Sequence, residues 1–154
     1  MIPSKITSTI KIRQGEARQE DNTIDTENIV RAAVEAAIEM KATELKILDV
    51  RGRTSFCDWF VLCNGNNSRQ MQAISDNILR QFKKEMGLNP MGVEGTRSNK
   101  WVLIDLGDVI VHVFERDMRG YYDLDGLWSD APTVTPEELG IDDVPADAVG
   151  YALP

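Results

Sequence analysis

The 154-residue sequence contains little of the chemistry that catalytic and metal sites require. It has one histidine, His112, and two cysteines, Cys57 and Cys63, which lie six positions apart with no second pair. A structural zinc site needs about four nitrogen or sulfur ligands, and a disulfide framework uses four or more cysteines in a short secreted chain. Both kinds of site are therefore disfavoured, and we interpret the cysteines as buried or half-buried reduced thiols.

Long hydrophobic runs are also absent. No apolar stretch approaches the roughly 20 residues that cross a bilayer, and the N-terminus lacks the basic start and apolar core of a secretory signal. Glu16, Glu20 and Asp21 argue against an organelle transit peptide. The composition, with 42% hydrophobic and 27% charged residues, is typical of a globular domain. We therefore expect a cytoplasmic protein without membrane contact.

Basic residues are missing from the end of the chain. Residues 130–154 carry six acidic side chains and no Lys or Arg, so they account for most of the net charge of −8 and leave −2 for residues 1–129. Binding to phosphate backbones needs clustered Lys and Arg, so little direct contact with RNA is expected. The charge, together with Pro132, Pro136 and Pro145, predicts an acidic, disordered C-terminal tail over residues 132–154. The polar residues 1–24 predict a flexible N-terminal arm.

The segment between these ends, residues 25–131, has the periodicity of a mixed α/β domain. Helical spacing predicts one helix that begins near Asp25 or Thr26. A second helix is capped by Ser68 or Asn67 and ends at Gly87. The two-residue connection 107–108 predicts an antiparallel hairpin. The expected strands are 46–51, 59–63, 91–94, 101–106 and 109–115, with a short helix near 118–128. This order predicts an α/β (α+β) fold, a mixed β-sheet of about five strands flanked by helices.

Individual polar residues do not form a catalytic constellation. No nucleophile or metal signature accompanies His112, so we interpret it as a strand histidine that is hydrogen-bonded and partly covered, or part of a contact surface, rather than as a general base. Asp105 near the hairpin is interpreted as a carboxylate that binds turn amides. The loop Gly65–Arg69 leads from a strand into a helix, where anions can bind, but it matches no phosphate-binding motif. No catalytic residue, metal ligand or cofactor is predicted.

The aromatic residues are candidates for partner contacts. Trp101 follows a polar stretch, so it should lie near a surface loop, and Tyr122 and Trp128 belong to the expected last helix. Large aromatic residues beside polar loops can anchor an interface, yet a small domain also needs them in its core. Core packing is favoured for Trp59 and Trp128, while both roles stay open for Trp101 and Tyr122.

Several segments together resemble one known family. The most diagnostic is the strand pair WVLIDLGDVIVHVF at 101–114, and YYDLDGLW at 121–128 closes the match. In order and spacing these segments resemble the ribosomal silencing factors, a family also called RsfS or Iojap. The loop at 65–70 reads GNNSRQ where members commonly have GTSSRH. The other matching segments are LDVRGRTS at 48–55, DWFVLC at 58–63, GNNSR at 65–69 and GVEG at 92–95.

The resemblance implies a fold similar to nucleotidyltransferases and a function without catalysis. Family members bind the large ribosomal subunit through ribosomal protein L-fourteen and sterically block its association with the small subunit, which represses translation. A nearly neutral domain suits a basic ribosomal protein. A nucleotide-handling enzyme and a large-subunit assembly factor are the alternatives, and a homodimer is compatible with the sequence. The contact residues carried over from the family are Trp101, Asp105, His112, Tyr122 and Trp128, with Glu94 and Arg69 as polar support.

Overall fold

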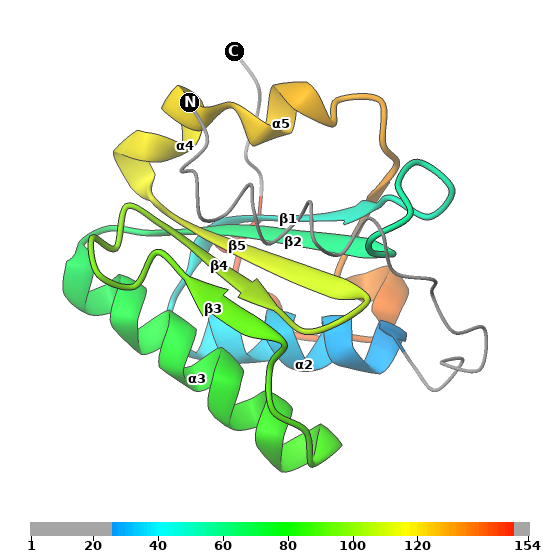
Figure 1. Cartoon of the computed structure of the whole chain (residues 1–154), viewed down its shortest axis with the longest axis horizontal. Coiled ribbons are helices and arrows are strands. Elements are labelled where there is room, and N and C mark those ends of the chain that lie inside the picture. Colours follow the sequence, from blue (N-terminus) through cyan, green and yellow to red (C-terminus); the bar gives the residue numbers. More distant parts are fainter. Residues whose placement is uncertain (1–25, 150–154) are drawn as a thin grey trace.

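The computed structural model describes residues 26–149 as a mixed β-sheet with helices on both faces (Figure 1). The predicted α/β (α+β) fold is confirmed, although the sheet has six strands where about five were expected. The predicted N-terminal arm lies outside the described residues, as do residues 150–154. No helix within residues 26–149 is long and apolar enough to span a membrane.

The elements follow the expected order closely. The helix pair α2 and α3 and the strands β1 to β5 all lie where the periodicity predicts them, with shifts of a few residues at their ends. The single last helix is instead a 3₁₀ turn followed by two four-residue helices. The bounds are α2 Thr26–Glu39, β1 Thr43–Asp49, β2 Trp59–Gly65, α3 Ser68–Met86, β3 Gly92–Glu94, β4 Trp101–Asp105, β5 Val109–Glu115, η1 Arg116–Met118, α4 Arg119–Tyr122, α5 Leu124–Leu127, β6 Thr133–Val134 and η2 Glu137–Leu139.

The sheet has the strand order β3-β4-β5-β2-β1-β6. β2 and β5 are parallel, and every other neighbouring pair is antiparallel. The predicted hairpin between β4 and β5 is confirmed. Its register pairs Leu103 with His112, so these two side chains lie on the same face. The parallel pair is central and β2 is buried along its whole length, as its uninterrupted apolar run predicted.

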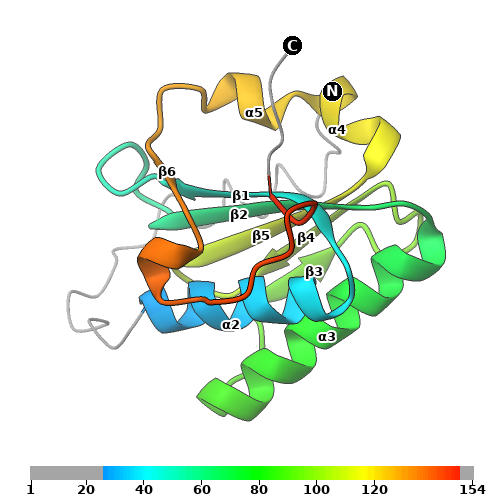
Figure 2. The ribbon, with the colours of Figure 1, turned by 180° about the vertical axis from the view of Figure 1, so that it is seen from behind.

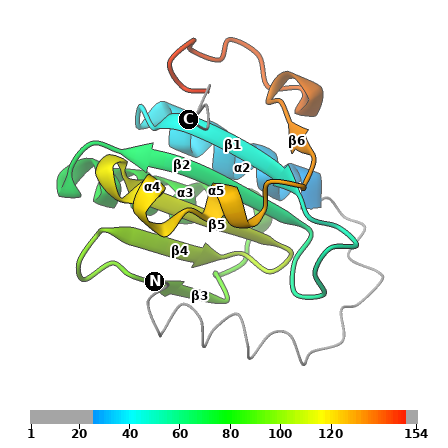
Figure 3. The ribbon, with the colours of Figure 1, turned by 90° about the horizontal axis from the view of Figure 1, so that it is seen from above.

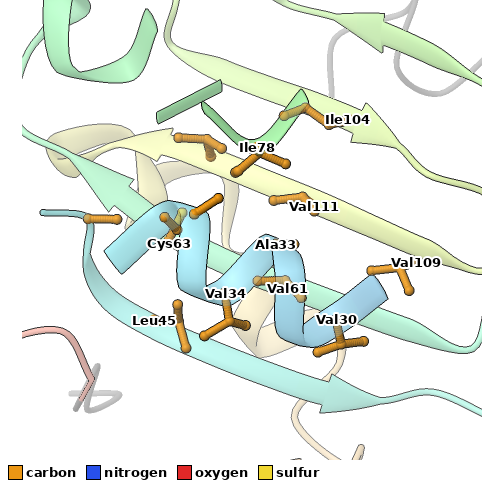
Figure 4. Packing of buried hydrophobic residues seen from close by; sticks show 14 of the residues in the cluster. Val30, Ala33, Val34, Leu45, Val61, Cys63, Ile78, Ile104, Val109 and Val111 are labelled. Carbon is orange, nitrogen blue, oxygen red and sulfur yellow. The ribbon is translucent and has the colours of Figure 1, made fainter. Parts of the chain in front are cut away.

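Helices α2 and α3 cover one face of the sheet. α2 presents Val30, Ala33 and Val34 to a core that includes Val61 and Val111 of the two central strands (Figure 4). The alanines leave little side-chain bulk between helix and sheet, which permits close packing. This face holds the larger of the two hydrophobic cores.

The second helix of this layer is capped at both ends. The Asn67 side chain accepts a hydrogen bond from the Gln70 N–H at 2.8 Å, which satisfies an orphan donor of the first turn. Gly87 ends α3 in the left-handed conformation with φ 66°, as a helix C-terminus favours. Gln70 also donates to the carbonyls of Met40 and Lys41, so the start of α3 is tied to the end of α2.

The segment η1–α4–α5 crosses the opposite face and lies over β2 and β5 (Figure 3). Beneath it is a second core that includes Phe60 and Leu62 of β2, Trp101 and Leu103 of β4, and Phe114 of β5. Both faces of the sheet are therefore covered by helical segments, but only this one is covered by helices of a single turn each.

The C-terminal segment is ordered, which corrects the expectation of a disordered tail. Residues 132–149 run along the β1 edge of the sheet and past α2 (Figure 2). In β6, Thr133 and Val134 pair with Leu48 and Ile47 of β1. Further along, the Leu45 N–H donates to the Ala148 carbonyl at 2.7 Å.

The physical reason lies in a few apolar side chains and an open strand edge. Leu139 and Ile141 are buried in the larger core, and the Arg31 Nε donates to the Leu139 carbonyl at 2.8 Å. β1 offers unpaired backbone groups that a nearby chain can satisfy. Mean composition and net charge do not reveal such widely spaced anchors, so the prediction of disorder is wrong for residues 132–149.

Candidate partner-binding site

Four of the predicted contact residues come together in one aromatic cluster. The Trp101 ring lies 4.7 Å from Tyr122 and 5.7 Å from His112, measured between ring centroids. Phe60 connects His112 with Trp128. Its ring centroid lies 5.1 Å from that of His112 and 5.2 Å from that of Trp128, and both contacts are edge-to-face. Such tilted and edge-to-face pairs are the favoured arrangements of aromatic rings. The cluster joins strands β2, β4 and β5 to the helical segment above them.

The residues of this cluster differ in exposure. Trp101 and His112 are only 2% and 1% exposed, so Trp101 does not lie at the surface as its polar neighbours suggested. Tyr122 at the end of α4 and Trp128 at the C-cap of α5 are half-buried and cover them. In this arrangement the two strand residues support the helical segment from below, and only the helical residues reach its outer surface.

His112 is held as a neutral side chain. Its Nδ1 accepts a hydrogen bond from the Trp101 Nε1–H at 3.0 Å, so in the neutral ring the proton is on Nε2. Nε2 has no hydrogen-bond partner among residues 26–149. The pKa of His112 is lowered to about 3, chiefly by burial and also by the nearby Arg119, while Asp125 acts in the opposite direction. His112 is therefore uncharged at neutral pH and unsuited to act as a surface proton carrier.

The depressed pKa of His112 predicts a pH-dependent stability. In the unfolded chain the histidine pKa is near 6.5. Below that pH His112 is protonated in the unfolded state but stays neutral in the folded state. The contribution of the neutral His112 to the free energy of unfolding is therefore fully present above pH 6.5. It decreases progressively as the pH falls to about 3. Between pH 7 and pH 5 we expect a loss of about 2 kcal/mol, measured by urea unfolding at each pH.

The matched control is His112→Gln, which keeps a hydrogen-bond acceptor for Trp101 but does not titrate. Its stability should change much less over the same pH range. Since His112 is the only histidine, its ring protons are also unambiguous in an NMR titration. A chemical-shift midpoint near pH 6.5 in the folded protein would show that the ring is not held neutral.

The remaining predicted residues occupy three different positions. Asp105 is buried at the end of β4, where its Oδ1 accepts from the Gly107 N–H at 3.0 Å, so its interpretation as a turn-binding carboxylate is confirmed. Glu94 is half-buried on β3 and pairs with Leu103, which places it on the same face as the cluster. Arg69 is exposed in the first turn of α3, in the helix layer that covers the other face.

The two cysteines and the acidic residues within 26–149 form no metal-binding group. Cys57 and Cys63 are both free and buried, as the sequence predicted, and burial raises the pKa of Cys63 to about 12. Within the described part of the chain, no three His, Cys, Asp or Glu side chains are grouped so that they could hold a metal ion.

A buried polar network fastens the helical segment to the sheet, and the sequence did not reveal it. Arg119 at the start of α4 is fully buried and donates two hydrogen bonds, both of 3.0 Å, to the carboxylate of Asp125 in α5. Its Nη1 also donates to Asn64 Oδ1 at 3.0 Å and to the Glu44 carbonyl oxygen. Lys46 Nζ lies 3.6 Å from Asp125. One guanidinium thus joins α4 and α5 to strands β1 and β2.

A sharp bend at Asp123 separates the two short helices. Asp123 adopts a left-handed conformation with φ 51°, and its Oδ1 accepts from the Gly126 N–H at 3.1 Å, which caps α5. A Cβ at Gly126 would lie 2.3 Å from the Asp123 carboxylate, so this tight cap requires glycine. The bend turns Tyr121 and Leu127 outward, where they are 68% and 65% exposed. We call residues 119–128 the α4–α5 corner.

Comparison with known proteins identifies the family. A family model described as ribosomal silencing factor during starvation matches residues 23–149. The chain belongs to the ribosomal silencing factor family. The match extends through the ordered C-terminal segment, beyond residue 131 where the sequence pattern had placed the end of the domain.

Individual members of the family agree with this assignment. The ribosomal silencing factor RsfS of Halalkalibacterium halodurans is 41% identical over 114 residues, which cover 74% of this chain and 97% of that protein. RsfS of Bacillus subtilis is 40% identical over 109 residues, covering 71% and 92% respectively. An X-ray crystal structure of a Chromobacterium violaceum protein has a TM-score of 0.66 at 32% identity and covers 84% of this chain and 97% of that one.

Proposed function

We propose that this protein silences ribosomes by occupying the large subunit. Membership of the ribosomal silencing factor family carries this proposal, because curated members at 40–41% identity are named for that role. The contact is proposed to be with ribosomal protein L-fourteen, on the face where the small subunit joins. A bound protein of 17.2 kDa would block that face by its volume alone, without any bond being made or broken.

The surface that supports this proposal is the face of the sheet that carries the aromatic cluster. Its outer layer is the α4–α5 corner, and its edge is formed by β3 and β4 with Glu94. The net charge of −8 favours a basic protein over the phosphates of ribosomal RNA, which an acidic chain repels. Three of the predicted contact residues, Trp101, Asp105 and His112, are buried. We therefore propose that they support the contact surface and do not touch the partner.

Sucrose-gradient sedimentation tests the proposal directly. Purified large and small subunits are mixed under conditions that favour joining, with and without a molar excess of this protein. We expect fewer joined ribosomes in its presence, and we expect the protein to travel with the large subunit. Normal joining, with the protein left at the top of the gradient, would contradict the proposal. An assembly factor would instead bind immature large subunits and leave mature ones free to join.

A nucleotide assay separates silencing from an enzymatic role. Incubation with nucleoside triphosphates and magnesium should give no turnover under the silencing hypothesis. Reproducible turnover that disappears in an Asp105→Asn variant would favour the nucleotide-handling alternative. Light scattering of the free protein would show whether the species that binds is a monomer or the homodimer that the sequence allows.

A further inference from the structure

Four large hydrophobic side chains are well exposed among the described residues, and they lie on two separate segments, two on each. Leu88 and Met91, 57% and 63% exposed, lie in the connection between α3 and β3. Tyr121 and Leu127 lie on the α4–α5 corner, next to the half-buried Tyr122 and Trp128. Figure 1 shows the two locations at opposite sides of the molecule. Exposed apolar patches on a domain of this size often mark contact surfaces.

The corner pair is held more rigidly than the size of its helices would predict. A four-residue helix has almost no stability of its own. Here the Arg119–Asp125 ion pair joins the two helices to each other, and Arg119 also bonds them to Asn64 of the sheet. The aromatic contacts of Tyr122 and Trp128 with strand residues add to this. A surface that is already ordered loses little conformational entropy when it binds. The corner therefore presents an aromatic ring and a leucine as pre-organised anchors.

The charges around the corner specify the kind of partner. Asp117, Asp123 and Asp130 are exposed around it, against one exposed guanidinium of the same segment, Arg116, which lies 3.6 Å from Asp117. Arg53 approaches Asp130 at 3.5 Å, and both side chains stay in contact with solvent. An apolar centre with a rim that is negative on balance complements a basic protein surface and repels nucleic-acid phosphates.

From these observations we infer that Tyr121 and Leu127 are the anchors that contact a basic ribosomal protein of the large subunit. This inference rests on the proposed function and specifies which residues carry the binding. Central apolar residues surrounded by polar ones contribute most of the energy of protein interfaces. Trp101 contacts Tyr122 of the corner, and His112 contacts Trp101, so these two buried residues support the corner. The sequence analysis did not select Tyr121 or Leu127 for contact.

The double variant Tyr121→Ser with Leu127→Ser tests the inference. Both side chains are exposed, so their replacement should leave the fold and the unfolding midpoint nearly unchanged. Binding to purified large subunits, measured by cosedimentation over a range of protein concentrations, should weaken about tenfold or more. The matched control is Leu88→Ser with Met91→Ser, which removes a similar exposed apolar pair from the other side of the molecule and should bind within about twofold of the unchanged protein.

The outcomes distinguish this inference from the proposed function. If the unchanged protein binds large subunits and the corner variant binds equally well, the anchors are wrong while the function stands. If the control variant loses binding and the corner variant does not, the contact surface is at the α3–β3 connection. If the unchanged protein fails to bind, the proposed function fails first. The unchanged protein should not bind protein-free ribosomal RNA. If it does, and the corner variant does not, the partner of the corner is RNA and the inference of a protein partner is wrong.

Discussion

Replacing Arg119 by methionine should lower the free energy of unfolding by about 3–5 kcal/mol, because it leaves a buried carboxylate without its partner. Arg119 and Asp125 are 0% and 1% exposed, so neither charge is solvated by water. The guanidinium makes two 3.0 Å hydrogen bonds to Asp125 and a third to Asn64. Lys46, 3.6 Å from Asp125, replaces only part of this interaction.

Removing both charges separates the cost of breaking the pair from its net contribution. In the double variant Arg119→Met with Asp125→Leu, no buried carboxylate is left behind, so much of the stability should return. Urea unfolding of the two variants and the unchanged protein gives all three free energies. A single variant as stable as the unchanged protein would mean that the network does not hold the α4–α5 corner in place. A double variant no better than the single one would mean that the loss comes from the Asn64 and Glu44 oxygens that Arg119 no longer satisfies, rather than from the unpaired carboxylate.

Replacing Trp101 by alanine should destabilise the fold by about 3–5 kcal/mol, the usual effect of deleting a buried aromatic side chain. From its polar neighbours Trp101 was expected near a surface loop, with both core packing and partner contact left open. The structure places its side chain in the core. Trp101 is 2% exposed and contacts His112, Phe114 and Tyr122, and its indole N–H is bonded to His112. The free energy of unfolding, measured in urea, checks the expected loss.

A conservative control distinguishes packing from partner contact at this position. Trp101→Phe retains an aromatic ring and should lose clearly less stability than Trp101→Ala. At a temperature where each variant is fully folded, both should bind large subunits better than the variant that lacks Tyr121 and Leu127. If Trp101→Ala is as stable as the unchanged protein and has lost binding, Trp101 is itself a contact residue and the surface must be reassigned.

Much of the architecture was predictable because it depends on local patterns. Helical spacing located α2 and α3, and a continuous apolar run identified β2 as a strand buried on both faces. The Gly107-Asp108 connection predicted the β4–β5 hairpin, since two-residue turns join antiparallel neighbours. The C-terminal segment was mispredicted because its few anchors, such as Leu139 and Ile141, become meaningful only beside the edge of β1.

The candidate site was predicted less completely than the fold. The resemblance named Trp101, His112, Tyr122 and Trp128 as contact residues, and the structure places these four in one cluster. Their contact with a partner stays a prediction. The resemblance could not show which of them are covered, because exposure depends on the segment that packs above each strand. Arg119 and Asp125 are six positions apart and belong to two different short helices, so no helical pair pattern points to them. Their proximity results from the bend at Asp123.

The sequence by itself determined the order of most helices and strands, the scarcity of catalytic groups and the family. Each of these follows from local periodicity, composition or a long match of neighbouring residues. The tertiary structure alone decided that residues 132–149 close the sheet edge, that Trp101 and His112 lie beneath the helices, and that Tyr121 and Leu127 face outward. Those features depend on contacts between segments distant in the chain, where burial is set by what packs against a residue.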